Sequence, residues 1–266
     1  MRDSATIPSV PSLAVFPETS APVEKPLTEP SVDSGLTKWR ALFEVLICSG
    51  YPTQFAIIGL LQLVGIHSKA DDQLSPLFVF LVSSLDTVLL LGLVFTFLKR
   101  SKERPGDVFL GPRSMVAEVG YGVLLVPALF ILMAFVQLLI QNLMPDLRNV
   151  PVNPFESLLR SPVARGAFII LVVVAGGVRE EFQRGFLLHR FEQRLGGGMV
   201  GVLVTSAAFG LGHTLQGLDA AIVTALLGAW WGLVYLARRS VVANVTSHGL
   251  FNAVQVLVGF SSRIGA

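Results

Sequence analysis

Five residues whose side chains could carry acid–base chemistry lie in the most apolar third of this 266-residue chain: Glu180, Glu181, His213, His248 and Asn252. A carboxylate can take a proton from water and return it to a leaving group, and histidine and amide groups can donate hydrogen bonds to an oxyanion. Polar groups at membrane depth are costly, so each requires a partner, a water-filled cavity or a chemical role. Their presence here predicts a functional site.

The composition indicates that these residues lie in a membrane protein. The chain is 52% hydrophobic and 14% charged, with a mean hydropathy of +0.67, whereas soluble domains have about 25% charged residues. This predicts an all-α fold, a polytopic bundle of transmembrane helices. The basic residues stand in short loops between apolar runs and form no nucleic-acid module, so no nucleic-acid partner is expected.

The chain divides into a tail and a membrane domain. Residues 1–36 are rich in Pro and Ser and predict a disordered cytoplasmic tail. Residues 37–266 predict a transmembrane domain, and its segment 162–260 holds all five of the polar residues named above. Apolar runs long enough to span about 30 Å of hydrocarbon predict about seven transmembrane helices. They are placed near 41–65, 75–98, 115–144, 162–194, 199–214, 218–236 and 241–260.

The distribution of Lys and Arg predicts the orientation. The loop after the second helix holds the strongest basic cluster of the chain, and cytoplasmic loops carry an excess of such residues. These residues are Lys99, Arg100, Lys102, Arg104 and Arg113. Alternation then places the N-terminus in the cytoplasm as well. We expect a multi-pass integral membrane protein, in the plasma membrane if the source is bacterial.

Helix geometry brings the polar residues to one depth. The glycines at 196–198 form a turn between two antiparallel helices, and Glu180 and His213 lie on either side of it. At a rise of 1.5 Å per residue, each is roughly 23 Å from the turn. His248 and Asn252 are four residues apart, which puts both on one face of the last helix. We therefore expect the three helices to contribute to one site.

Structural roles remain open for each residue taken alone. Glu180 and Glu181 could form a self-neutralising ion-pair patch with Arg179 and Arg184 at a helix end. The histidines could be hydrogen-bonded packing residues, and Asn252 could join helices. Convergence of all these groups at one depth favours a functional site.

Three motifs, in this order, resemble the CPBP family of intramembrane metalloproteases, also called the Abi family. This family contains the type II CAAX prenyl proteases and bacteriocin-immunity proteins. The motifs are Glu180-Glu181 with Arg184-Gly185, Phe209-x-x-x-His213 and His248-x-x-x-Asn252. The resemblance implies a catalytic set of Glu180, Glu181, His213, His248 and Asn252, with Arg184 and Phe209 in support.

The first motif departs from the family pattern by one residue. The family has three residues between the Glu pair and the Arg, and this chain has two. If Arg184 is the anchor, Arg179 takes the place of the leading Glu. If the spacing to His213 is the anchor, Glu180 takes it. We favour Glu180 as the base, held in place by Glu181 or Arg184.

The metal question stays open at this stage. His213, His248 and Glu180 would supply the two histidines and one carboxylate of a catalytic Zn²⁺ site with an open position for water. The chain contains no His-Glu-x-x-His motif. A metal-free glutamate mechanism is equally compatible with these residue types.

The expected function is that of an intramembrane endopeptidase in contact with membrane lipid. Its substrates would be membrane-associated peptides or proteins, and prenylated tails are the class that the resemblance implies. Two alternatives stay open. The first is a non-catalytic immunity or scaffold protein that uses the polar core to bind a partner. The second is a transporter with a Glu180–His213 proton relay, which the lack of an evident inverted repeat disfavours.

Overall fold

The computed structural model describes residues 36–70, 73–159 and 161–261. The predicted tail therefore lies outside the described residues, apart from Leu36. The helices are α1 (Lys38–Ile47), α2 (Tyr51–Leu63), α3 (Pro76–Arg100), α4 (Pro105–Phe109), α5 (Met115–Leu143), α6 (Pro162–Leu171), α7 (Glu180–Arg194), α8 (Gly198–Leu211), α9 (Leu218–Arg238) and α10 (Val242–Ser261). Shorter helical segments are η1 (Pro145–Leu147), η2 (Pro154–Leu159), the π-helix η3 (Val172–Arg179) and η4 (Thr214–Gln216), and β1 (Lys69–Ala70) pairs antiparallel with β2 (Gln73–Leu74).

The all-α bundle is confirmed, and each of the seven predicted segments is helical. Two of them are interrupted. The first consists of α1 and α2, which meet at a bend of 42°, and the fourth runs through α6, η3 and α7. Four helices are long and apolar enough to cross a membrane, or five if the bent pair is one span. The count of seven spans is not confirmed: α8 has only 14 residues, and polar residues interrupt the apolar sequence of α10.

Local sequence signals explain where the helices begin and end. The side chains of Ser75 and Ser161 accept hydrogen bonds from the first turns of α3 and α6, and a proline follows each serine. Gly196 and Gly197 have φ values of +98° and +93°, which other residues rarely adopt, and they form the turn between α7 and α8. The predicted glycine turn is confirmed.

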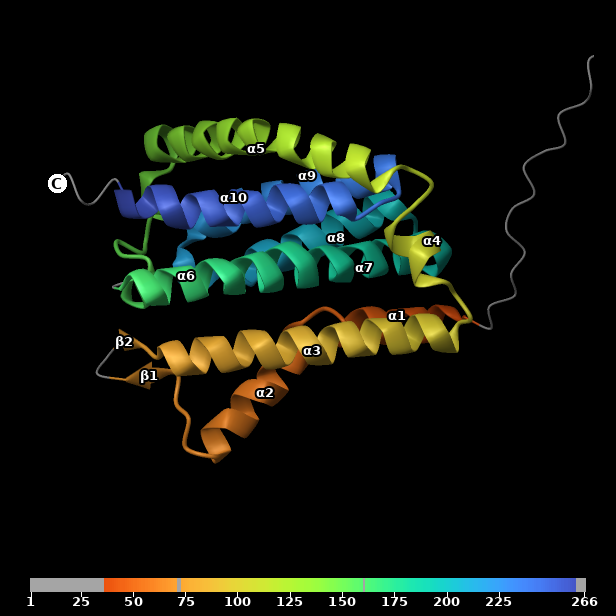
Figure 1. The fold of residues 1–266 in the computed structure, drawn as a ribbon, viewed down its shortest axis with the longest axis horizontal. Helices are drawn as coiled ribbons and strands as arrows, with labels where there is room; N and C mark the ends of the chain where they lie inside the picture. Colours follow the sequence, from red (N-terminus) through yellow and green to blue (C-terminus); the bar gives the residue numbers. More distant parts are fainter. Residues whose placement is uncertain (1–35, 71–72, 160, 262–266) are drawn as a thin grey trace, which may run out of the picture. The chain divides into compact units, whose positions relative to one another are not determined.

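The helices pack so that α10 lies between α5 and the rod formed by α6, η3 and α7, and α3 packs against the other side of that rod (Figure 1). Glycines allow α9 to approach α8 closely. A Cβ atom at Gly228 would lie 2.9 Å from the Phe209 ring, and one at Gly232 would lie 3.0 Å from Val202. The motif-bearing helices therefore form the centre of the bundle.

Large apolar side chains are exposed on the outward-facing sides of the helices. Leu124 and Ile131 of α5 and Leu203 of α8 are at least two-thirds exposed, while the polar residues of the motifs face inward. Exposed apolar surface of this extent is typical of a lipid-facing protein. With four to five candidate spans, the chain is an integral membrane protein.

Candidate active site

The two adjacent glutamates lie where η3 ends and α7 begins, and they face different surroundings. π-Helical turns are rare and often occur at functional sites. The Glu181 side chain is completely buried, whereas the Glu180 side chain keeps 16% of its surface exposed. The two carboxylates therefore have different roles.

Glu181 orients the ring of His248. One of its oxygens, Oε1, accepts hydrogen bonds from His248 Nδ1, at 2.7 Å, and from Arg184. The other, Oε2, accepts from Asn244 Nδ2 at 3.1 Å. The His248 ring also stacks on Trp231, with ring centroids 3.8 Å apart. With Nδ1 bound to a carboxylate, Nε2 is the nitrogen left for chemistry.

Glu180 lies next to that free nitrogen. Its Oε2 is 3.9 Å from His248 Nε2, and its Oε1 accepts a 2.9 Å hydrogen bond from Arg179 Nη2. The expectation that Glu181 or Arg184 holds Glu180 was wrong, because both of those side chains are engaged with each other. Arg179 holds Glu180 instead. The gap of 3.9 Å is too long for a direct hydrogen bond but fits one bridging water molecule.

Arg179 is itself anchored by a carboxylate from another helix. Its Nη1 donates a 2.9 Å hydrogen bond to Oδ2 of Asp86, which is buried in the middle of α3. Asp86 Oδ1 accepts from Thr53 Oγ1 at 2.5 Å, and Gln54 also contacts this carboxylate. The predicted self-neutralising ion pairs are thus present. Each pair also bonds to a residue of a second helix, which a simple ion-pair patch at a helix end would not do.

His248 and Asn252 share one face of α10, as predicted, and that face meets a pair of glycines in η3. A Cβ atom at Gly176 would lie 2.4 Å from Asn252 Nδ2 and 3.8 Å from His248 Nε2, and one at Gly177 would lie 2.9 Å from the Cα atom of Gly249. Only glycine allows this approach. The Asn252 amide donates to the carbonyl of Val172 at 3.4 Å.

His213 reaches the site through Phe209. The ring centroid of Phe209 lies 4.8 Å from that of His213 and 6.2 Å from that of His248, and the Arg184 guanidinium lies over the same phenyl ring. His213 Nδ1 pairs with the Phe209 carbonyl. Within the described residues, His213 forms no direct hydrogen bond to Glu180, Glu181 or His248.

Residues 162–254 match the family model described as Type II CAAX prenyl endopeptidase Rce1-like. The CPBP resemblance is confirmed over this segment. No significant match was found among curated proteins or solved structures. The Rce1-like family consists of CAAX-type intramembrane proteases, which act on membrane-associated, prenylated proteins. Asp86 and Thr53 lie outside the Rce1-like segment. Two helices beyond that segment, α3 and α2, therefore also supply side chains to the hydrogen-bond network that holds Glu180.

The arrangement of the donors does not fit the Zn²⁺ site considered from sequence. Among the described residues, no three His, Cys, Asp or Glu side chains are grouped so that they could hold a metal ion. His248 Nε2 and Glu180 Oε2 approach each other, but His213 pairs with a backbone carbonyl. A catalytic zinc usually has three protein ligands.

Sequence reasoning missed several residues of the candidate site. Asp86 could have been found, because it is the one acidic residue in the apolar run 75–98, and a charge at that depth is a functional signal. Asn244 and Trp231 gave no such signal. Their importance depends on contacts with His248 and Glu181, which lie far away in the sequence.

Proposed function

We propose that this chain is an intramembrane endopeptidase of the glutamate type that cleaves membrane-associated peptides or proteins. The observation that carries the proposal is the 3.9 Å gap between Glu180 Oε2 and His248 Nε2. A hydrogen bond fixes the position of each group: Arg179 holds Glu180, and Glu181 holds His248. Such preorganised groups can act on a water and a carbonyl without rearranging.

Glu180 acts as the base in this proposal. It takes a proton from a water molecule, the hydroxide attacks the peptide carbonyl carbon, and the proton is then delivered to the leaving amine as the C–N bond breaks. One carboxylate serves both proton transfers. Its partial exposure leaves room for the water, which the fully buried Glu181 does not have.

His248 and Asn252 stabilise the oxyanion. Their Nε2 and Nδ2 atoms lie on the same side of α10 against Gly176. Three carboxylates of the site, those of Asp86, Glu180 and Glu181, are paired with only two guanidiniums. The remaining negative charge lies next to His248, which donates from Nδ1 to Glu181 and, when Nε2 carries a proton, from Nε2 to the oxyanion.

Prenylated CAAX-type tails are the substrate class we propose, since the Rce1-like family acts on them. The test uses purified full-length protein in proteoliposomes and a farnesylated CAAX peptide together with a peptide library. Wild type should release a new peptide amine, and Glu180→Gln should not. A chelator such as 1,10-phenanthroline should leave the cleavage rate unchanged. Loss of activity with the chelator would contradict the proposal of a glutamate-type protease.

The non-catalytic alternative is favoured by one contact. The Arg179 guanidinium donates a hydrogen bond to Glu180, so this carboxylate already has a fixed partner. A membrane immunity or scaffold protein would then use the same polar cluster to bind a partner. Partner capture that is equal for wild type and Glu180→Gln, without any cleaved product, would support this role.

A further inference from the structure

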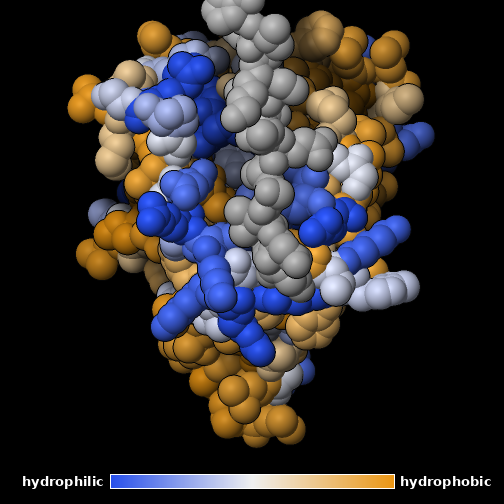
Figure 2. All heavy atoms as spheres, turned by 90° about the vertical axis from the view of Figure 1, so that its right-hand side faces the viewer, coloured by the Kyte–Doolittle hydropathy of each residue, from blue (hydrophilic) through white to orange (hydrophobic). Residues whose placement is uncertain are grey.

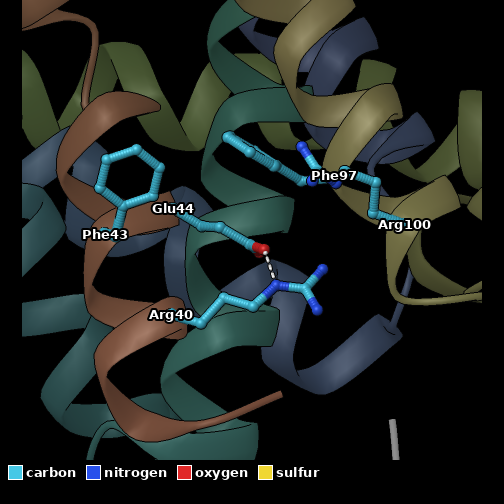
Figure 3. A pocket seen from close by; sticks show the side chains of 5 residues that line it. All are labelled: Arg40, Phe43, Glu44, Phe97 and Arg100. Carbon is cyan, nitrogen blue, oxygen red and sulfur yellow. Dashed lines mark hydrogen bonds and ion pairs between the residues drawn. The ribbon is translucent and has the colours of Figure 1, made fainter. Parts of the chain in front are cut away.

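A hollow of about 390 Å³ lies between α1 and the last turns of α3, apart from the carboxylate site (Figure 3). Its lining residues are Arg40, Phe43, Glu44, Phe97 and Arg100. Volumes of about 300–1,000 Å³ are typical of pockets that bind small groups. None of the lining residues belongs to the proposed catalytic set, so the hollow requires its own explanation.

The position of the hollow corresponds to the edge of the membrane. Arg100 is the last residue of α3, an apolar helix that is long enough to span the hydrocarbon. On α1, the large side chains of Trp39, Phe43 and Leu46 are all more than half exposed, and their spacing places them on one face. Exposed aromatic residues beside a terminal arginine are typical of the headgroup level.

Basic residues surround this edge. Figure 2 shows hydrophilic side chains gathered on the face where α3 ends. Lys99, Arg100 and Lys102 are all exposed there. Such clusters attract the anionic headgroups of the membrane.

The acidic residue in the hollow is already neutralised. Glu44 is buried and accepts from Arg40 Nε at 2.9 Å and from Arg190 Nε at 2.7 Å. Arg40 uses Nη2 for Ser101, which leaves its Nη1 group available. Arg100 forms no hydrogen bond or ion pair within the part of the chain that the structure describes. The hollow therefore presents two guanidiniums with unused donors.

We propose that this hollow binds the phosphate group of an anionic membrane phospholipid. Arg40 and Arg100 donate to the phosphate oxygens, which guanidinium geometry suits. Phe43 and Phe97 border the glycerol and the first carbons of the acyl chains, which would continue along the exposed apolar face of α1. The lipid thus holds α1 and α3 together at the membrane edge, independently of catalysis.

The test is native mass spectrometry of the full-length protein in detergent, with equal amounts of phosphatidylglycerol and phosphatidylcholine. Wild type should retain phosphatidylglycerol preferentially. Arg100→Gln should weaken that retention by about fivefold, the effect of one basic contact near a lipid surface. Among the described residues, the Arg100 side chain has no hydrogen bond or ion pair to lose, so its substitution should leave the fold intact. Arg100→Lys should restore part of the binding.

Lys102→Gln is the matched control, because Lys102 carries the same charge in the same basic segment but does not line the hollow. It should retain phosphatidylglycerol like wild type. Equal losses in Lys102→Gln and Arg100→Gln, or no preference between the two lipids, would overturn the proposal. Displacement of the lipid by inorganic phosphate at comparable concentration would assign the hollow to free phosphate and overturn the lipid assignment too.

Discussion

Arg179 Nη1 donates a 2.9 Å hydrogen bond to Asp86 Oδ2, although the two residues are 93 positions apart in the chain. Because the other end of the same guanidinium binds Glu180, the contact connects α3 to the proposed base. Asp86 neutralises Arg179, so that this guanidinium does not fully neutralise Glu180. The relationship gives α3 a role in positioning a residue of another helix.

Asp86→Asn should lower kcat about tenfold with little change in KM, because Arg179 would lose its carboxylate partner on α3 and would no longer hold Glu180 in position. Peptide cleavage in proteoliposomes measures both constants. The effects of Asp86→Asn and Arg179→Gln should be non-additive if the two side chains act as one unit.

Glu118→Gln is the control for this prediction. Glu118 is an equally buried carboxylate that pairs with Arg238 between α5 and α9, away from the site. The Glu118→Gln variant should be less stable than wild type, but its folded fraction should keep the wild-type kcat. An Asp86→Asn variant with unchanged kcat would show that Asp86 has only a structural role.

The two glutamates should respond differently to the same substitution. Glu181→Gln leaves Arg184 without its buried ion-pair partner, and loss of one partner destabilises by about 3–5 kcal/mol. Glu180→Gln should abolish cleavage while the midpoint of thermal unfolding stays close to that of wild type, because its carboxylate is partly exposed. Thermal unfolding in detergent, measured alongside activity, makes this distinction. A large loss of stability in Glu180→Gln alone would reverse the assigned roles.

Gly176→Ala should inactivate the protein by displacing Asn252. The added Cβ would lie 2.4 Å from Asn252 Nδ2, a contact that requires movement and costs about 1–3 kcal/mol. Gly166→Ala in α6 is the matched control, since nothing lies within 4 Å of the added atom. Activity and yield of the two variants are compared. Wild-type activity of Gly176→Ala would argue against an oxyanion role for Asn252.

The loop residue Glu103 should make folding sensitive to acid. Burial alone would raise the pKa of this carboxyl, but hydrogen bonds from three α7 side chains and the charge of Arg190 lower the pKa from 4.5 to about 2. The three side chains are His189, Gln193 and Arg190. A group whose pKa is lower in the folded state stabilises the fold above its unfolded pKa, and this stability is lost as pH falls from about 4.5 to about 2.

Glu103→Gln should therefore lower stability at neutral pH, on the order of 2 kcal/mol after discounting for partial exposure. The variant should also show a weaker loss of stability between pH 4.5 and pH 2 than wild type does. Unfolding midpoints across this range measure the effect. Parallel pH profiles for the two proteins would contradict it.

Much of the fold followed from hydropathy, because apolar runs of membrane length have few alternatives to a helix. The glycine turn at 196–198 and the shared face of His248 and Asn252 also depended only on local geometry. The bend between α1 and α2 and the π-helix at 172–179 did not follow. The π-helix packs against α10 and α3, and hydropathy does not encode this packing. The bend lies at Gly50, whose φ is +91°, and this is a local signal that hydropathy does not use.

The residues of the candidate site could be named from the sequence, whereas their hydrogen-bond partners could not. The motif residues are polar side chains in apolar surroundings, and such a signal is local. Glu181 holds His248, and Arg179 holds Glu180. These pairings depend on how each helix is rotated about its axis, which residue spacing does not fix. Asp86 reaches the site only because α3 packs against η3 and α7.

The most direct test of the account compares peptide termini in membranes of cells that express wild type or Glu180→Gln at matched levels. We predict new termini in the wild-type membranes that are absent with the variant, and their sequences would identify the substrate. Identical termini in both membranes, with wild type shown to be folded and abundant, would contradict the proposal that this chain is a protease.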